Sequence, residues 1–196
     1  DKPSIAVLPF DNLSKDQSDA YIADGLTENL ISTLSMIPQL LVIAKNSTFV
    51  YKGKAVKVNQ VAEELGVRYV LEGSVQKSEN KIRVIAQLID AVSGHHLWSE
   101  RYDMEIKDFF QILDEITIKI ADALRLKMVR GGDVSTMGST SSFEAWSNYV
   151  KGVRHFDRFT KQANIRVREL AKKAIEFDPK YVRALALVGW AHWSDV

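Results

Sequence analysis

The first 130 residues alternate between short apolar runs and stretches in which apolar residues recur every three or four positions. Residues 5–10 and 40–44 are continuous apolar runs, which are typical of strands buried on both faces. The chain between them predicts an amphipathic helix that ends before Pro38, because proline disfavours helical geometry in the residue preceding it. The apolar stripe of this helix consists of Ile22, Leu26, Leu30, Leu34 and Ile37.

A short helix and a run of strands come next. Residues 46–57 have the composition of a loop, and residues 58–65 predict a helix ending at Gly66, a residue suited to the left-handed position that follows a helix. Three strand-like runs, separated by turn residues, predict an antiparallel meander. These runs are 68–76, 81–90 and 96–103. A second long helix is expected from Asp108, with a stripe of Phe109, Leu113, Ile116, Ile120 and Leu124.

The composition changes at residues 131–142, which are rich in glycine, serine and threonine and almost free of large apolar side chains. We expect this segment to be an interdomain linker. The remaining residues have only helical periodicity. The sequence therefore predicts an α/β domain over residues 1–130, a linker over 131–142 and a helical segment over 143–196.

The helical segment resembles the junction between two tetratricopeptide repeats. The matching residues are Ala174, Asp178, Pro179, Tyr181, Leu185, Val188 and Gly189, with Gly152 as the corresponding glycine of the first repeat. Proline stops one helix, and the small residues allow neighbouring helices to approach closely. The resemblance implies that more repeats follow in a longer protein, because one repeat helix cannot bury its apolar face alone. A generic helical hairpin is the alternative.

The α/β half resembles the TolB N-terminal-like domain of bacterial proteins. Four segments carry the resemblance, at residues 3–12, 23–30, 66–75 and 87–91. The resemblance implies a two-layer α/β (α+β) fold with a small mixed sheet packed by helices. It also implies a place between an N-terminal effector and a C-terminal tetratricopeptide array. The effector would be a class III adenylate or guanylate cyclase, or else a winged-helix transcription regulator, and residues 1–5 are most similar to the segment after a cyclase domain.

Charge and composition narrow the classes of partner. The net charge is +1, so no global field attracts nucleic acid or an acidic membrane, and we expect no nucleic-acid partner. Residues 151–196 carry a net charge of +5, which indicates either a solvated helical surface or a basic face for an acidic partner. The chain has no cysteine, which excludes disulfides and thiolate metal sites.

Nothing in the sequence is long and apolar enough to span a membrane, and no signal peptide is visible. We expect no membrane segment in this chain. A cytoplasmic location is favoured, and a periplasmic one stays open if an anchor has been removed. Because the chain begins with Asp1, we expect it to be a piece of a longer protein.

Catalytic fingerprints are absent from the sequence, including phosphate-binding glycine loops and the His-Glu-x-x-His zinc motif. We therefore predict no catalytic residue, no metal site and no cofactor. Asp24 and Glu28 lie one helical turn apart and, with residues 46–57, leave open a small-ligand or nucleotide-binding domain. Acidic residues near a helix start are also favoured by the helix dipole alone. The aromatic and lysine residues of 47–54 fit either a nucleic-acid platform or a loop that packs over the sheet.

The repeat resemblance places one set of aromatic and basic residues on the inner surface of the array. We predict that these residues bind a protein or peptide partner, since aromatics and arginine are the usual interface anchors. They are Tyr149, Phe156, Arg183, Trp190 and Trp193. The alternative is that the tryptophans are core residues for helices outside this chain. The function expected is a non-catalytic regulatory and protein-interaction module of a bacterial signalling protein, and a homodimer stays open.

Overall fold

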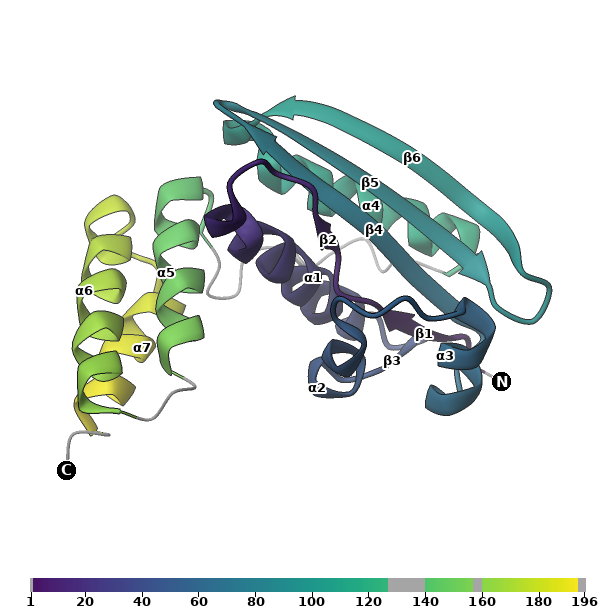
Figure 1. Ribbon diagram of the computed structural model, residues 1–196, viewed down its shortest axis with the longest axis horizontal. Helices are drawn as coiled ribbons and strands as arrows, with labels where there is room; N and C mark the ends of the chain where they lie inside the picture. Colours follow the sequence, from purple (N-terminus) through teal and green to yellow (C-terminus); the bar gives the residue numbers. More distant parts are fainter. Residues whose placement is uncertain (1, 127–139, 157–159, 194–196) are drawn as a thin grey trace. The chain divides into compact units, whose positions relative to one another are not determined.

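The computed structural model describes residues 2–126, 140–156 and 160–193, and the chain separates into two compact units, Asp1–Gly132 and Asp133–Val196. The first unit is an α/β domain and the second is helical (Figure 1). The strands are β1 (Ser4–Val7), β2 (Asp11–Asn12), β3 (Leu41–Val42), β4 (Tyr69–Ser78), β5 (Lys81–Asp90) and β6 (His95–Glu105). The helices are α1 (Ala20–Ser35), α2 (Lys45–Thr48), α3 (Val58–Leu65), α4 (Phe109–Ala123), α5 (Phe143–Phe156), α6 (Lys161–Phe177) and α7 (Val182–Trp193).

The six described strands form one mixed sheet. Five of them lie in the order β3-β1-β4-β5-β6, and β2 lies off this order and pairs with β4. β1 is parallel to both β3 and β4, and β2 is also parallel to β4, whereas β4, β5 and β6 form an antiparallel meander. The predicted meander is therefore confirmed. Gly66 adopts a positive φ of 65°, as its position after α3 requires.

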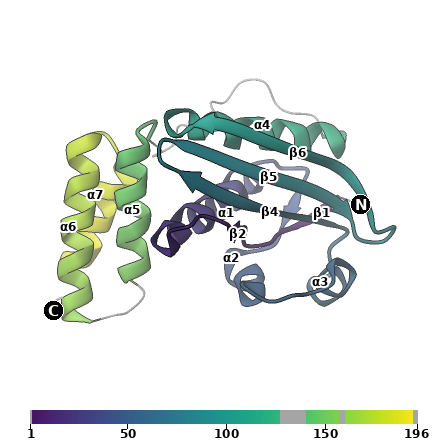
Figure 2. The same ribbon diagram turned by 45° about the horizontal axis from the view of Figure 1, so that its top comes forward.

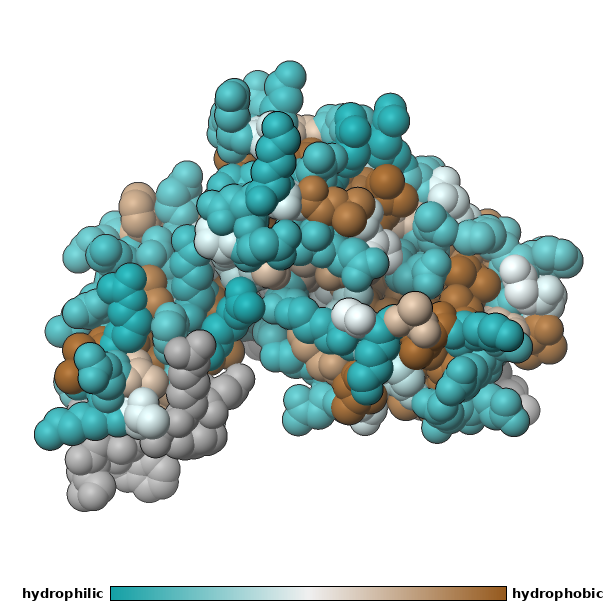
Figure 3. Space-filling view, in the orientation of Figure 1, coloured by the Kyte–Doolittle hydropathy of each residue, from teal (hydrophilic) through white to brown (hydrophobic). Residues whose placement is uncertain are grey.

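Helices α1 and α4 lie side by side against one face of this sheet (Figures 1 and 2). The core between them is largely aliphatic, because the predicted stripes of both helices are buried together with strand residues such as Leu71, Val84 and Leu88. Leu124, the last residue of the second stripe, is only half-buried and follows the end of α4. On the opposite face, Val61 and Ala62 of α3 cover a smaller apolar cluster near the start of β4. The face of the α/β unit seen in Figure 3 is mostly hydrophilic, with its hydrophobic residues in separate patches.

Two sequence predictions were wrong in detail. The apolar run 5–10 is not one strand: β1 ends at Val7, the chain leaves the sheet over residues 8–10, and β2 begins at Asp11. The expected loop 46–57 contains most of α2 and a 3-10 turn at Phe49–Tyr51. Both differences are local responses to tertiary packing, which periodicity over so few residues does not encode.

Residues 8–10, which leave the sheet between β1 and β2, are fixed by hydrogen bonds at both ends and in the middle. The backbone N–H groups of Leu8 and Leu13 donate to carbonyls of β4 at 2.8 Å each. Between them, the N–H of Phe10 donates to the Thr27 hydroxyl at 3.0 Å, and that hydroxyl donates to the Ala23 carbonyl at 2.8 Å. The ring of Phe10 occupies the space where a side chain at Gly73 would stand, since a Cβ there would lie 2.4 Å from it. Glycine at position 73 is therefore a packing requirement.

A charged pair joins the start of β4 to the end of β5. The Arg68 guanidinium donates to Asp90 through Nε at 3.1 Å and Nη2 at 2.8 Å. Burial by itself raises the pKa of Asp90, but hydrogen bonds from Arg68 and from the N–H groups of Val92 and Ser93 outweigh it and hold that pKa below its usual value. Because the pKa is lower in the folded state, this carboxylate stabilises the fold above its unfolded pKa, and the contribution is lost as the pH falls through the folded pKa.

Replacing Thr27 tests the role of the buried hydroxyl. Thr27→Val keeps the shape but leaves the buried Phe10 N–H without an acceptor, so it should lower the free energy of unfolding by about 1–3 kcal/mol. Thr27→Ser keeps the hydroxyl and should cost about 1 kcal/mol, the value of one buried methyl group. Urea denaturation followed by far-ultraviolet circular dichroism measures both, and equal losses would show that the hydrogen bond contributes nothing.

Candidate functional site

The helical unit is built around small residues at its helix crossings. A Cβ at Gly152 in α5 would lie 3.1 Å from Leu187 of α7 and 3.6 Å from Leu170 of α6, so this glycine lets three helices meet closely. Ala174 is fully buried, in a cluster with Ala145, Tyr181 and Ala184. Helix α6 is capped by the residue before it, Thr160, whose hydroxyl accepts from the Ala163 N–H.

The predicted partner-binding residues fall into separate groups in this unit. Tyr149 is half-buried and packs its ring 5.2 Å from that of Tyr181, so it belongs to the junction of α5 and α7. Phe156 and Trp190 come from α5 and α7, and their ring centroids are 6.2 Å apart. Trp190 is nevertheless 65% exposed. The structure therefore brings Phe156 and Trp190 together as a partly exposed aromatic pair.

Helix α7 also exposes aliphatic residues. Val182 and Leu185 are about half exposed, and a Cβ at Gly189 would meet no described atom within 4 Å. The close approach expected at Gly189 is thus not made within the described residues. Arg183 is half-buried on the same helix, and the side chain of Trp193 lies outside the described residues. We call the exposed residues Val182, Leu185, Gly189 and Trp190 the α7 face.

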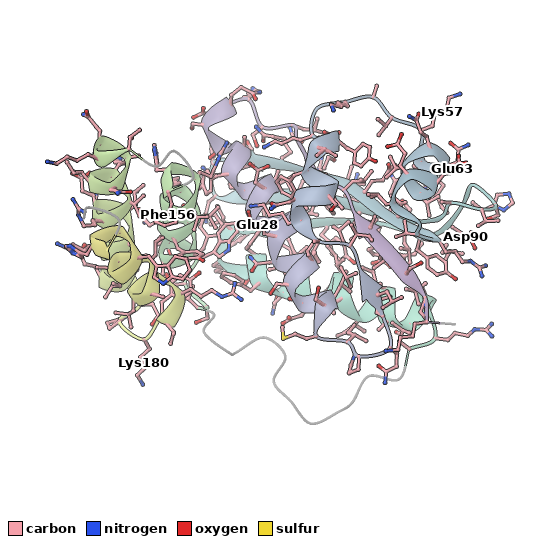
Figure 4. The ribbon with its side chains drawn as sticks, turned by 90° about the horizontal axis from the view of Figure 1, so that it is seen from below. Glu28, Lys57, Glu63, Asp90, Phe156 and Lys180 are labelled. Atoms are coloured by element: carbon pink, nitrogen blue, oxygen red, sulfur yellow. The ribbon has the colours of Figure 1, made fainter. Side chains whose placement is uncertain are left out.

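The acidic pair of α1 is held by lysines. Asp24 is buried, and the ammonium group of Lys52 lies 2.5 and 2.6 Å from its two carboxylate oxygens. Glu28, which is labelled in Figure 4, is paired with Lys45. The ammonium group of Lys45 also lies 5.0 Å from the centre of the Phe49 ring. Sequence analysis found the two acids but missed these cations, which come from 17 and 28 residues further along the chain. The pairs join α1 to the segment after β3.

The aromatic residues of the 47–54 segment pack against the domain. Tyr51 is partly buried against the α3 cluster, and its hydroxyl donates to Glu64 of that helix. Phe49 lies under the Lys45 ammonium group. These contacts favour the packing interpretation of the segment over a stacking platform.

A cleft of about 400 Å³ lies on the other side of this segment, between residues 53–56 and the open face of β4 and β5. Its wall includes Glu72, and burial raises the pKa of that carboxyl, an effect that His96 opposes and Asp11 increases. Asp24 and Glu28 do not line the cleft. Of the residues that suggested a ligand site, part of the 46–57 segment lines this cleft, and the acidic pair of α1 does not.

Among the residues that the structure describes, no group of three or more histidine, aspartate or glutamate side chains could hold a metal ion. His95 and His96 are exposed at the start of β6. In the described part of the chain, no helix combines the length and the apolar character that crossing a bilayer requires.

Residues 1–122 match the family described as HilA/YgeH-like transcriptional regulator, second domain, and the chain belongs to this family. It is also 44% identical over 187 residues to a protein of Rhizobium meliloti (strain 1021) named putative adenylate cyclase 3. The match covers 94% of this chain and 32% of that protein, so the chain spans about a third of its relative.

Several solved structures are similar to part of this chain. TolB from Acinetobacter baumannii is 21% identical with a TM-score of 0.49, over 63% of this chain and 28% of TolB. Lipoprotein GNA1162 from Neisseria meningitidis is 21% identical with a TM-score of 0.46, over 61% of this chain and 96% of the lipoprotein. The LpoB C-terminal domain from Salmonella enterica is 19% identical with a TM-score of 0.43, over 53% of this chain and 83% of that domain.

The two lysine pairs should differ in their effect on stability. Lys52→Met leaves the buried Asp24 carboxylate without its cation and should lower the free energy of unfolding by about 1–3 kcal/mol. Lys45→Met breaks a half-exposed pair and should cost about 1 kcal/mol or less. Lys54→Met, an exposed neighbour on the same segment, is the matched control. Thermal or urea unfolding measures all three, and a Lys52 variant as stable as the control would contradict the structural role of the pair.

Proposed function

We propose that this chain is a non-catalytic regulatory module of a bacterial signalling protein, lying C-terminal to an adenylate or guanylate cyclase domain. The observation that carries the proposal is the 44% identity over 94% of the chain to part of a longer protein named putative adenylate cyclase. The chain itself contains none of the phosphate-binding or metal-binding fingerprints that such chemistry needs. Its role would be to bias the effector through binding, which requires a preference for one of two arrangements.

The helical unit is proposed to be the start of a tetratricopeptide array that binds a protein or peptide. Two observations support this assignment. Helices α5 and α7 carry Gly152 and Gly189, which the resemblance makes equivalent, and the rings of Phe156 and Trp190 on these two helices lie side by side. The α7 face is apolar and exposed, as expected for a repeat helix that packs on a further repeat or on a partner.

A second candidate is favoured by the family to which the chain belongs. Its description as the second domain of a transcriptional regulator supports a position beside a DNA-binding effector instead of a cyclase. In both cases this chain would be the regulatory region and the upstream domain the effector. Sequencing the gene upstream of the codon for Asp1 separates them, because a cyclase domain and a winged-helix domain have different sequences.

The regulatory proposal is tested in the Rhizobium meliloti relative, by replacing its matching region with this chain. Cyclic AMP formation from ATP is measured for the whole relative, for the exchanged protein and for a deletion of the region. The exchange should preserve regulated activity, and the deletion should change the rate about five-fold or more, the usual lower end of allosteric coupling. This chain alone should form no cyclic AMP.

Variants of the helical unit complete the experiment. In the exchanged protein, Trp190→Ala should move the rate toward that of the deletion, because it removes the largest exposed ring of the α7 face. Ile165→Ala, at a similarly exposed apolar residue of α6, should leave the rate unchanged. A deletion with the activity of the intact relative, or cyclic AMP formation by this chain alone, would refute the proposal.

A further inference from the structure

Strand β6 forms one edge of the sheet and is its longest strand, with eleven residues (Figures 1 and 2). Within the described residues, β5 is its only strand partner. An exposed strand edge carries a row of unpaired N–H and C=O groups, so it pairs readily with another strand unless the protein blocks it.

The register fixes which backbone groups of β6 face outward. The N–H of Ile106 donates to the carbonyl of Asn80 across the β5–β6 pair. In an antiparallel ladder, hydrogen-bonded and non-hydrogen-bonded pairs alternate, so the pairs in step with Asn80–Ile106 are the hydrogen-bonded ones. They are Ile82–Met104, Val84–Tyr102 and Ala86–Glu100. The N–H and C=O groups of the residues between them, at positions 99, 101, 103 and 105, therefore point away from β5.

The side chains of these four residues lie on the open face of the sheet, since alternate residues of a strand point to opposite faces and Tyr102 is buried on the other one. All four are exposed. Arg101 and Asp103 are neighbours on this face, with Nε and carboxylate oxygen 3.0 Å apart, and Asp103 also accepts from Arg83 of β5 at 2.5 Å. The edge thus presents one positive and one negative residue two positions apart, and both bracket Tyr102.

We propose that a second copy of this chain pairs with β6 in antiparallel orientation, in the register centred on Tyr102. In this register Arg101 stands opposite the partner's Asp103, and Asp103 stands opposite the partner's Arg101. The two-fold axis makes both ion pairs equivalent, and the hydrogen-bonded ladder runs over residues 99–105. The sheet then continues through both copies.

Charge favours this register over the registers centred one residue earlier or later. Moving the centre to position 101 places two arginines opposite each other, and moving it to position 103 does the same with two aspartates. Like charges directly opposite on paired strands are destabilising, whereas opposite charges stabilise. Charged side chains on an edge strand usually discourage pairing with other strands. The edge of β6 instead complements a copy of itself, which is why the occupant is a second copy.

The proposed β6 dimer surface shares no residue with the α7 face. A test that contradicts this inference therefore leaves the proposed function standing, and the reverse also holds. The full chain is studied by sedimentation equilibrium, and dimers are expected. Arg101→Asp and Asp103→Arg each place like charges opposite each other twice, so each variant alone should weaken dimerisation about ten-fold or more. An equimolar mixture of the two variants should recover a dimer as tight as the original, because every facing pair is then of opposite charge.

Two further variants distinguish a strand edge from other contacts. Ser99→Pro removes an N–H that points away from β5, so it should leave the fold intact and weaken the dimer. Trp190→Ala should leave dimerisation unchanged, which excludes association through the α7 face. Far-ultraviolet circular dichroism verifies the fold of each variant. A monomeric chain at all concentrations, a dimer insensitive to the two charge variants, or a mixture that stays monomeric would overturn the proposal.

Discussion

The α/β domain depends on one crossing, where residues 8–10 leave the sheet and Phe10 inserts its ring over Gly73. The geometry is possible only because position 73 has no side chain and because the Thr27 hydroxyl accepts the N–H that the sheet no longer pairs. A buried donor without an acceptor is costly, so α1 is tied in place by the same bond. Three of the four segments that carry the TolB-like resemblance meet here, and the fourth holds Asp90, which closes the other end of β4 through Arg68. Those segments are therefore recognisable because they build the fold, and they need not carry chemistry.

Two ion pairs of the domain also stabilise its fold. The lysines at positions 45 and 52 neutralise the two acids of α1 and fasten the segment after β3 to that helix. Among the described residues, an apolar helix face in one unit and a charged strand edge in the other are exposed. Both are extended surfaces, of the kind that the proposed regulatory role would use. If the proposed effector domain precedes β1, a sheet continued through two copies would also bring two such domains together.

Much of the architecture was predictable from the sequence. The stripes of α1 and α4, the β4–β5–β6 meander and the left-handed Gly66 all follow from periodicity and local conformational preference. These signals extend over many residues or depend on one residue with unusual backbone freedom, so they survive without knowledge of the surroundings. The helices α5 to α7 were likewise indicated by their periodicity and by the Asp178-Pro179 break between α6 and α7.

The tertiary structure decided the rest. It ended the strand expected over residues 5–10 at Val7 and began a second short strand only at Asp11, because pairing with β4 and packing on α1 outweigh the local preference of six residues. It supplied Asp24 and Glu28 with cations from a segment that the sequence indicated only as a loop, since ion pairs between distant residues leave no periodic signal. It also separated Tyr149, which packs between helices, from the exposed Trp190. Residue type by itself determined that both were aromatic candidates, and only the packing of three helices determined which one faces outward.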